Sequence, residues 1–137
     1  MIDVLVIPAA IVTDIQKQAG EEAPNEACGY LSGDEGVVRS RIPMVNVDAS
    51  PEHFSFDPNE QFSALKQSRE RSERLIAVYH SHPETPARMS REDIRLANDP
   101  VTAYVIHSVA DNATRAYRVD REKHVTEIAV QIATGVW

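Results

Sequence analysis

Two histidines, His80 and His82, directly follow the apolar run 75–79, which is expected to form a buried strand. Because side chains alternate between the two faces of a strand, both imidazoles point to the same side. Pro83 cannot donate to a sheet and ends the strand there. Neutral imidazoles side by side at a strand end are typical ligands of zinc. The spacing therefore predicts a metal site at this end of the strand.

Asp93 is the third candidate ligand, since a catalytic zinc takes three protein ligands and keeps a fourth position for water. It lies in the first turn of a helix expected over 90–98, where the helix dipole favours an ionised carboxylate. Ser90 and Asp93 also have the spacing of a helix-capping box, in which both side chains bind backbone amides. The residue types leave both functions open for Asp93, and the two nearby histidines favour the ligand.

Hydrophobic periodicity predicts the elements that must position these residues. The expected strands are short apolar runs, at 2–7, 27–32, 37–47, 75–79, 103–109, 113–119 and 125–132. The expected helices are at 8–20, 58–73 and 90–98. Pro8 opens the first helix and Gly20 is its stop signal, while Asp57 caps the second helix, whose Phe62 and Leu65 should face inward.

Strands and helices mix here without a strict βαβ alternation. We therefore expect an α/β or α+β fold in which a central mixed β-sheet is flanked by helices. The length of 137 residues fits one domain over 1–137.

Composition excludes several classes of partner. The formal net charge is −7 at pH 7, so the protein should repel the phosphate backbone of nucleic acids. The single cysteine, Cys28, cannot form an internal disulfide and fits a reducing compartment. No apolar run approaches the roughly 18 residues of a membrane helix, and the N-terminus lacks a signal-peptide pattern. We therefore expect a cytoplasmic protein whose partners are neither nucleic acid nor membrane. Its oligomeric state stays open, a homodimer included.

A glutamate upstream of His-x-His-Pro, followed after six residues by Ser-x-x-Asp, resembles the signature of the JAMM metallopeptidases. These enzymes are the active branch of the MPN domain superfamily. The resemblance implies a cytidine-deaminase-like MPN fold and a zinc ion held by His80, His82 and Asp93. It also implies that Glu26 is the general base and that Ser90 helps to stabilise the oxyanion. Spacing alone does not place Glu26 near the histidines.

The chain is close to the minimal domain of that family and resembles its stand-alone prokaryotic members, which act on ubiquitin-like sulfur-carrier proteins. The resemblance implies a zinc-dependent peptidase or isopeptidase that hydrolyses the bond after the C-terminal Gly-Gly of such a carrier. The partner would be the C-terminal tail of the carrier, and the product would be cysteine or another C-terminal residue. An alternative is a deconjugating isopeptidase that removes ubiquitin-like proteins from lysines.

Other functions stay open with less support. A non-catalytic MPN module could use zinc to bind a protein, but a structural zinc usually has four protein ligands, often cysteines. A nucleobase deaminase needs a Pro-Cys-x-x-Cys signature, which the chain lacks. Cys28 should be a small core residue on the same side of its strand as Glu26, and Ser81 should point away from the metal. The remaining histidines are expected to be packed or exposed, with a smaller chance that the first borders the site: His53, His107 and His124.

Overall fold

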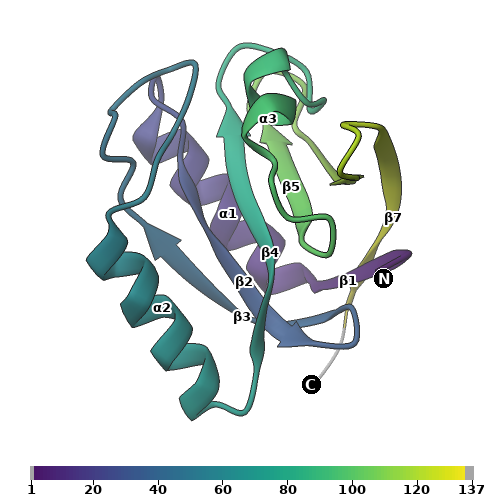
Figure 1. The fold of residues 1–137 in the computed structure, drawn as a ribbon. Coiled ribbons are helices and arrows are strands. Elements are labelled where there is room, and N and C mark those ends of the chain that lie inside the picture. Colours follow the sequence, from purple (N-terminus) through teal and green to yellow (C-terminus); the bar gives the residue numbers. More distant parts are fainter. Residues whose placement is uncertain (1, 135–137) are drawn as a thin grey trace.

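The strands close into one mixed sheet (Figure 1). The computed structural model describes residues 2–134. Its strands are β1 Val4–Pro8, β2 Cys28–Asp34, β3 Val37–Met44, β4 Arg74–His82, β5 Ala103–Ser108, β6 Ala113–Val119 and β7 Val125–Ala133. They pair in the order β1-β3-β2-β4-β5-β6-β7, and β7 pairs in parallel with β1 to close the ring. The expected mixed sheet is confirmed, and its closure is a feature that the sequence did not predict.

Helices α1 (Ala9–Glu22) and α2 (Pro58–Glu70) pack on opposite faces of this sheet. Figure 1 shows α1 crossing behind the strands and α2 lying along the side of β2 and β3. The short α3 (Arg91–Leu96) lies near the end of β5. Among residues 2–134, no helix is long and apolar enough to cross a membrane.

The main core lies between α1 and the inner face of the sheet. It contains Val12 and Ile15 of α1 together with buried residues of the strands, such as Leu31 and Tyr79. Gly29 has no room for a side chain, because an added Cβ would lie 2.4 Å from the Tyr79 ring. A second, smaller cluster lies on the other face, under α2, and contains Cys28, Ile42, Met44 and Ala64.

Two helix predictions are wrong in detail. Gly20 does not end α1, which runs on to Glu22, because glycine in a helix costs only about 1 kcal/mol and Pro24 is the real obstacle to a further turn. Phe62 does not face inward, since it is 70% exposed. The buried residues of α2 are the small Ala64 and Ser68, and Phe62 lies about 200° around the helix from Ala64.

Several strand boundaries also differ from the prediction. β4 extends to His82, so both histidines lie within the strand. β3 ends at Met44 instead of residue 47, and residues 45–57 form an irregular segment. α3 covers only part of the expected 90–98. These differences shift the ends of elements and leave their order as predicted.

Candidate metal and catalytic centre

The strand β4 brings His80 and His82 to one face, as their spacing predicts. Their Nε2 atoms are 3.1 Å apart. The Oδ2 atom of Asp93, in the first turn of α3, lies 3.0 Å from Nε2 of His82 and 3.2 Å from Nε2 of His80. All three side chains are buried, with at most 5% of the side chain exposed. The structure thus brings together the three predicted ligands.

The triangle of these three atoms fits a tetrahedral metal ion. Ligand atoms at about 2.0–2.1 Å from zinc, at tetrahedral angles, are about 3.3 Å apart, and the sides of the triangle are 3.0–3.2 Å. Nδ1 of His82 lies 2.9 Å from the carbonyl oxygen of Pro86. Because a carbonyl only accepts, this nitrogen donates its proton, so Nε2 carries the lone pair when the ring is neutral and could bind a metal in place of its contact with Asp93. The donor set suits zinc.

The Asp93 carboxylate carries the negative charge of the site. Burial alone would raise the pKa of Asp93, but the hydrogen bonds with His80 and His82 and one from the Ser90 amide hold it well below its usual range. The pKa of His82 is raised: burial opposes the charge, and the hydrogen bonds to Asp93 and the Pro86 carbonyl outweigh it. Asp93 is therefore an ionised carboxylate at neutral pH, as a zinc ligand must be.

The capping box predicted at Ser90 is present alongside the histidine contacts. Oγ of Ser90 accepts from the amide of Asp93, and Oδ2 of Asp93 accepts from the amide of Ser90, both at 3.0 Å. The same Oδ2 atom faces both imidazoles, so the cap does not draw Asp93 away from the histidines. The Ser90 hydroxyl acts only as an acceptor in the cap, which leaves its proton for another acceptor.

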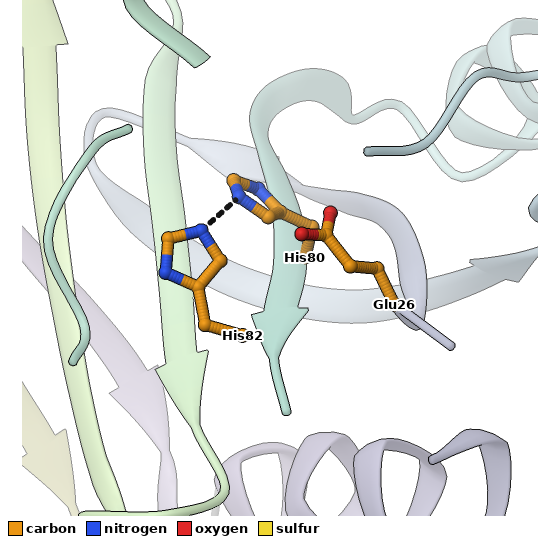
Figure 2. A group of neighbouring side chains, drawn as sticks. All are labelled: Glu26, His80 and His82. Atoms are coloured by element: carbon orange, nitrogen blue, oxygen red, sulfur yellow. Dashed lines mark hydrogen bonds between the residues drawn. The ribbon is translucent and has the colours of Figure 1, made fainter. Parts of the chain in front are cut away.

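Glu26 lies two residues before the start of β2 and is 2% exposed. Cys28 pairs with His80 across β2 and β4, and this pairing brings a carboxyl oxygen of Glu26 within 4.8 Å of ligand atoms of both histidines (Figure 2). Burial raises the pKa of Glu26 to about 8; His82 opposes this rise, and the carboxylates of Asp93 and Glu52 add to it. One oxygen, Oε1, is buried without a partner among the described residues.

Glu26 and Asp93 are both close enough to the histidines to be ligands. Without a metal their environments differ, since hydrogen bonds hold the pKa of Asp93 well below its usual range, whereas burial raises the pKa of Glu26 to about 8. A carboxyl that exchanges its proton near neutral pH suits acid–base chemistry, whereas an ionised one suits a metal. The arrangement can therefore combine a three-ligand metal site with a neighbouring proton carrier.

The other residues singled out from the sequence do not join this centre. Cys28 is fully buried, and burial, with smaller contributions from nearby carboxylates, raises the pKa of its thiol to about 12, as befits a core residue. The Ser81 side chain points away from the histidines and accepts from the Ala27 amide at 2.8 Å. His107 is buried against Thr114.

His124 is exposed beside Asp120 and Glu122. These three side chains form a second group with metal-ligand spacing, but all are exposed and they lie outside the centre described above. His53 does border the site: it bonds Asp48 and lines a groove of about 390 Å³ that also touches His80 and Asp93. The less favoured prediction for His53 is therefore the correct one.

Two contacts at the site were missed by sequence reasoning. The ring of Phe54 stacks on the His80 imidazole, with centroids 4.8 Å apart and planes inclined by 28°. The Pro86 carbonyl orients His82. Both belong to irregular segments whose paths are set by tertiary contacts, so no periodic pattern could place them.

Known proteins of one family match most of the chain. Residues 8–120 match the family Prok-JAB, the prokaryotic homologs of the JAB domain. The CysO-cysteine peptidase of Mycobacterium tuberculosis is 38% identical over 121 residues, which cover 85% of this chain and 83% of that protein. A probable TtuB-protein conjugate cleaving protease of Thermus thermophilus is 33% identical over 128 residues, covering 93% and 84%.

Solved structures show the same fold. The solution structure of a protein from Desulfitobacterium hafniense is 35% identical and superimposes with a TM-score of 0.88, covering 96% of this chain and 94% of that one. A JAB1/MPN domain protein from Archaeoglobus fulgidus, 20% identical, gives a TM-score of 0.61 over 93% and 97% of the two chains, which supports an α+β MPN fold. The chain therefore belongs to the family of prokaryotic JAB-domain homologs, and it is a hydrolase of the JAMM type.

Proposed function

We propose that the protein is a zinc-dependent peptidase that cuts after the C-terminal Gly-Gly of a ubiquitin-like sulfur-carrier protein and releases cysteine or another C-terminal residue. The observation that carries this proposal is the buried triangle of His80, His82 and Asp93 beside the Glu26 carboxyl. The 38% identity to a CysO-cysteine peptidase supports the proposed substrate class.

In this proposal His80, His82 and Asp93 hold the zinc ion. Zinc in such a site would supply Lewis-acid chemistry, polarising the scissile carbonyl and lowering the pKa of water. The Pro86 carbonyl keeps the lone pair of His82 directed toward the ligand triangle. The Phe54 ring stacks on the His80 imidazole and covers one of its faces.

Glu26 is the general base. It takes a proton from the attacking water and passes it to the nitrogen of the departing residue, so the proton count balances over the cycle. A nearby cation lowers the pKa of a carboxyl, so zinc would bring Glu26 down from about 8 toward the range in which it accepts a proton at neutral pH. The free hydroxyl proton of Ser90 would donate to the oxygen that becomes negative during attack.

The groove beside the site fits an extended peptide tail. It is lined mainly by apolar and aromatic side chains, which include Tyr30, Phe54, Phe56, Val78, Leu96 and Tyr104. Its volume of about 390 Å³ is more than two glycines need, so it has room for side chains that precede the Gly-Gly. Glu92 and Asp99 also line it. Because the apolar and aromatic side chains predominate, we expect the carrier to place an apolar side chain in the groove, a few residues before its Gly-Gly.

The direct test uses a carrier protein that ends in Gly-Gly with one added cysteine. Incubation with the zinc-loaded protein should reduce the carrier mass by one cysteine residue, as measured by intact-mass spectrometry. Glu26→Gln should bind zinc and release cysteine at least about a hundredfold more slowly, the scale of general-base catalysis. Absence of release by the zinc-loaded protein, with the carrier bound, would favour a non-catalytic binding module.

A second candidate is a deconjugating isopeptidase, which the 33% identity to a TtuB-protein conjugate cleaving protease favours. The same carrier joined through its Gly-Gly to a lysine side chain discriminates between the two reactions. Faster cleavage of the lysine conjugate than of the cysteine adduct would make deconjugation the main activity.

A further inference from the structure

The irregular segment 45–57, which joins β3 to α2, folds back on itself over Glu26. The amide of Val47 donates to the carbonyl of Ser55 at 3.1 Å, which closes the segment into a loop. The amide of Glu26 donates to the carbonyl of Ser50 in the same loop at 2.8 Å. The loop is thus joined to the residue that we propose as the base.

Asn46 is the hub of this loop. It is 6% exposed, and its amide uses all of its hydrogen-bonding capacity. Nδ2 donates to the carbonyls of Glu26 and His53 at 3.1 and 3.0 Å. Oδ1 accepts from the amides of Asp48 and Ser55 at 3.1 and 3.4 Å. Only a side chain that both donates and accepts can make this set of contacts.

The peptide bond between Glu26 and Ala27 is held on both of its polar groups. Asn46 donates to the Glu26 carbonyl, and Oγ of Ser81 accepts from the Ala27 amide at 2.8 Å. Ser81 is 1% exposed and lies in β4 between the two histidines, with its side chain on the opposite face. Two buried side chains from separate parts of the chain therefore fix one peptide bond relative to the metal-binding strand.

These two hydrogen bonds to the peptide matter because few contacts fix the Glu26 carboxyl directly. Its Oε1 atom has no partner among the described residues, so the position of the carboxyl depends on the backbone that carries it. Asn46 also binds the residues on either side of Phe54, whose ring stacks on His80 at 4.8 Å. The same amide thus links the proposed base to the aromatic ring that covers a proposed ligand.

We propose that Asn46 is a positioning residue that, together with Ser81, fixes the Glu26 peptide so that its carboxyl faces the two histidines. The inference rests on the proposed function, since it takes Glu26 as the general base. A displacement of about 1 Å in a catalytic group costs up to about a hundredfold in rate. Loss of the Asn46 amide should therefore reduce kcat and leave substrate binding nearly unchanged.

The test is a double-mutant cycle in the zinc-loaded protein, with the cysteine-extended Gly-Gly carrier as substrate. Asn46→Ala should lower kcat about tenfold to a hundredfold, with KM within about twofold and zinc content unchanged. In the Glu26→Gln background the same substitution should cause almost no further loss, because residues that act as a unit are not additive. Losses that multiply, or an unchanged kcat in Asn46→Ala, would overturn the inference.

Gln18→Ala is the matched control. Gln18 is also an amide that donates to a backbone carbonyl of β2, that of Cys28 at 3.1 Å, but it comes from α1 on the opposite face. Gln18→Ala should lower the free energy of unfolding. Any loss of kcat that it causes should multiply with the loss caused by Glu26→Gln. Asn46→Asp keeps the acceptors and removes both donors, so it should reproduce the loss seen with alanine. Should Asn46→Ala fail to fold, Asn46→Asp or Ser81→Ala supplies the same cycle.

Hydrogen exchange in the zinc-free protein gives a readout that does not depend on activity. The amides of Glu26 and Ala27 should exchange at least about tenfold faster in Asn46→Ala than in the parent, relative to the amides of β6. Equal exchange rates in both proteins would contradict the claim that Asn46 fixes the Glu26–Ala27 peptide. An active Glu26→Gln enzyme would instead refute the base assignment, which is a separate outcome from the failure of Asn46.

Discussion

Replacing Glu26 by glutamine should stabilise the zinc-free protein at alkaline pH, even though it removes the proposed base. Glu26 is 2% exposed and its pKa is raised to about 8 by burial. Below about pH 4.5, the carboxyl is protonated in the folded and unfolded states and costs nothing. Between about pH 4.5 and 8 the carboxyl ionises only in the unfolded state. The free energy of unfolding therefore falls as pH rises through this range. Glutamine is neutral throughout.

The size of the effect follows from the pKa shift. A difference between the ordinary value of 4.5 and about 8 corresponds to about 2–4 kcal/mol at pH 8, the smaller figure allowing for water that enters the site. For a chain of this length, that is roughly 5–15 °C in Tm. Glu26→Gln should therefore unfold at a higher temperature than the parent at pH 8, and the two should converge toward pH 5.

The assay is thermal unfolding by circular dichroism after zinc has been removed with a chelator, at half-unit steps from pH 5 to pH 9. Glu52→Gln is the control, because Glu52 is exposed and also contributes to the raised pKa of Glu26. It should change Tm by less than about 2 °C at pH 8. Equal or lower stability of Glu26→Gln at pH 8 would show that the carboxyl is not held in a desolvating site, and the reasoning would fail.

Further predictions concern the oxyanion donor, the packing of β2 and the ligand charge. Ser90→Ala should lower kcat by about a hundredfold or more and cost about 1 kcal/mol of stability as a lost cap; Ser90→Asp should restore the stability and not the rate. Gly29→Ala should destabilise the protein by about 1–3 kcal/mol in urea unfolding, because its Cβ would meet the Tyr79 ring at 2.4 Å. Gly20→Ala, with no atom within 4 Å, should instead stabilise α1 by about 0.5–1 kcal/mol. Asp93→Asn should weaken zinc binding in a competition titration, whereas unchanged affinity would exclude Asp93 as a ligand.

The part of the site that could be predicted from the sequence is the part that local geometry decides. The alternation of a strand puts His80 and His82 on one face, and the structure places them so. The helix start at Ser90 brings Asp93 to the same point. Glu26 needed the family resemblance, because its approach to the histidines depends on the long-range pairing of β2 with β4. The structure brings these residues together, and their catalytic roles remain proposals.

What could not be predicted depends on tertiary packing. Periodicity shows that α2 is a helix but does not fix its rotation, and the sheet accepts the small Ala64 and Ser68 while Phe62 stays exposed. The closure of the sheet through β1 and β7 has no local signal. The contacts of Asn46 and Phe54 arise where an irregular segment folds back on the sheet, and such a path is set by the completed fold.

The most direct test of the account is the zinc content of the purified protein, measured by mass spectrometry of the metal. We expect about one zinc per chain in the parent protein and in His124→Ala, whose histidine belongs to the exposed cluster with Asp120 and Glu122. His82→Ala should retain less than about a tenth of that amount, because the ligand triangle is broken. A parent protein that takes up no zinc, or a His82→Ala variant with undiminished zinc, would contradict the central claim.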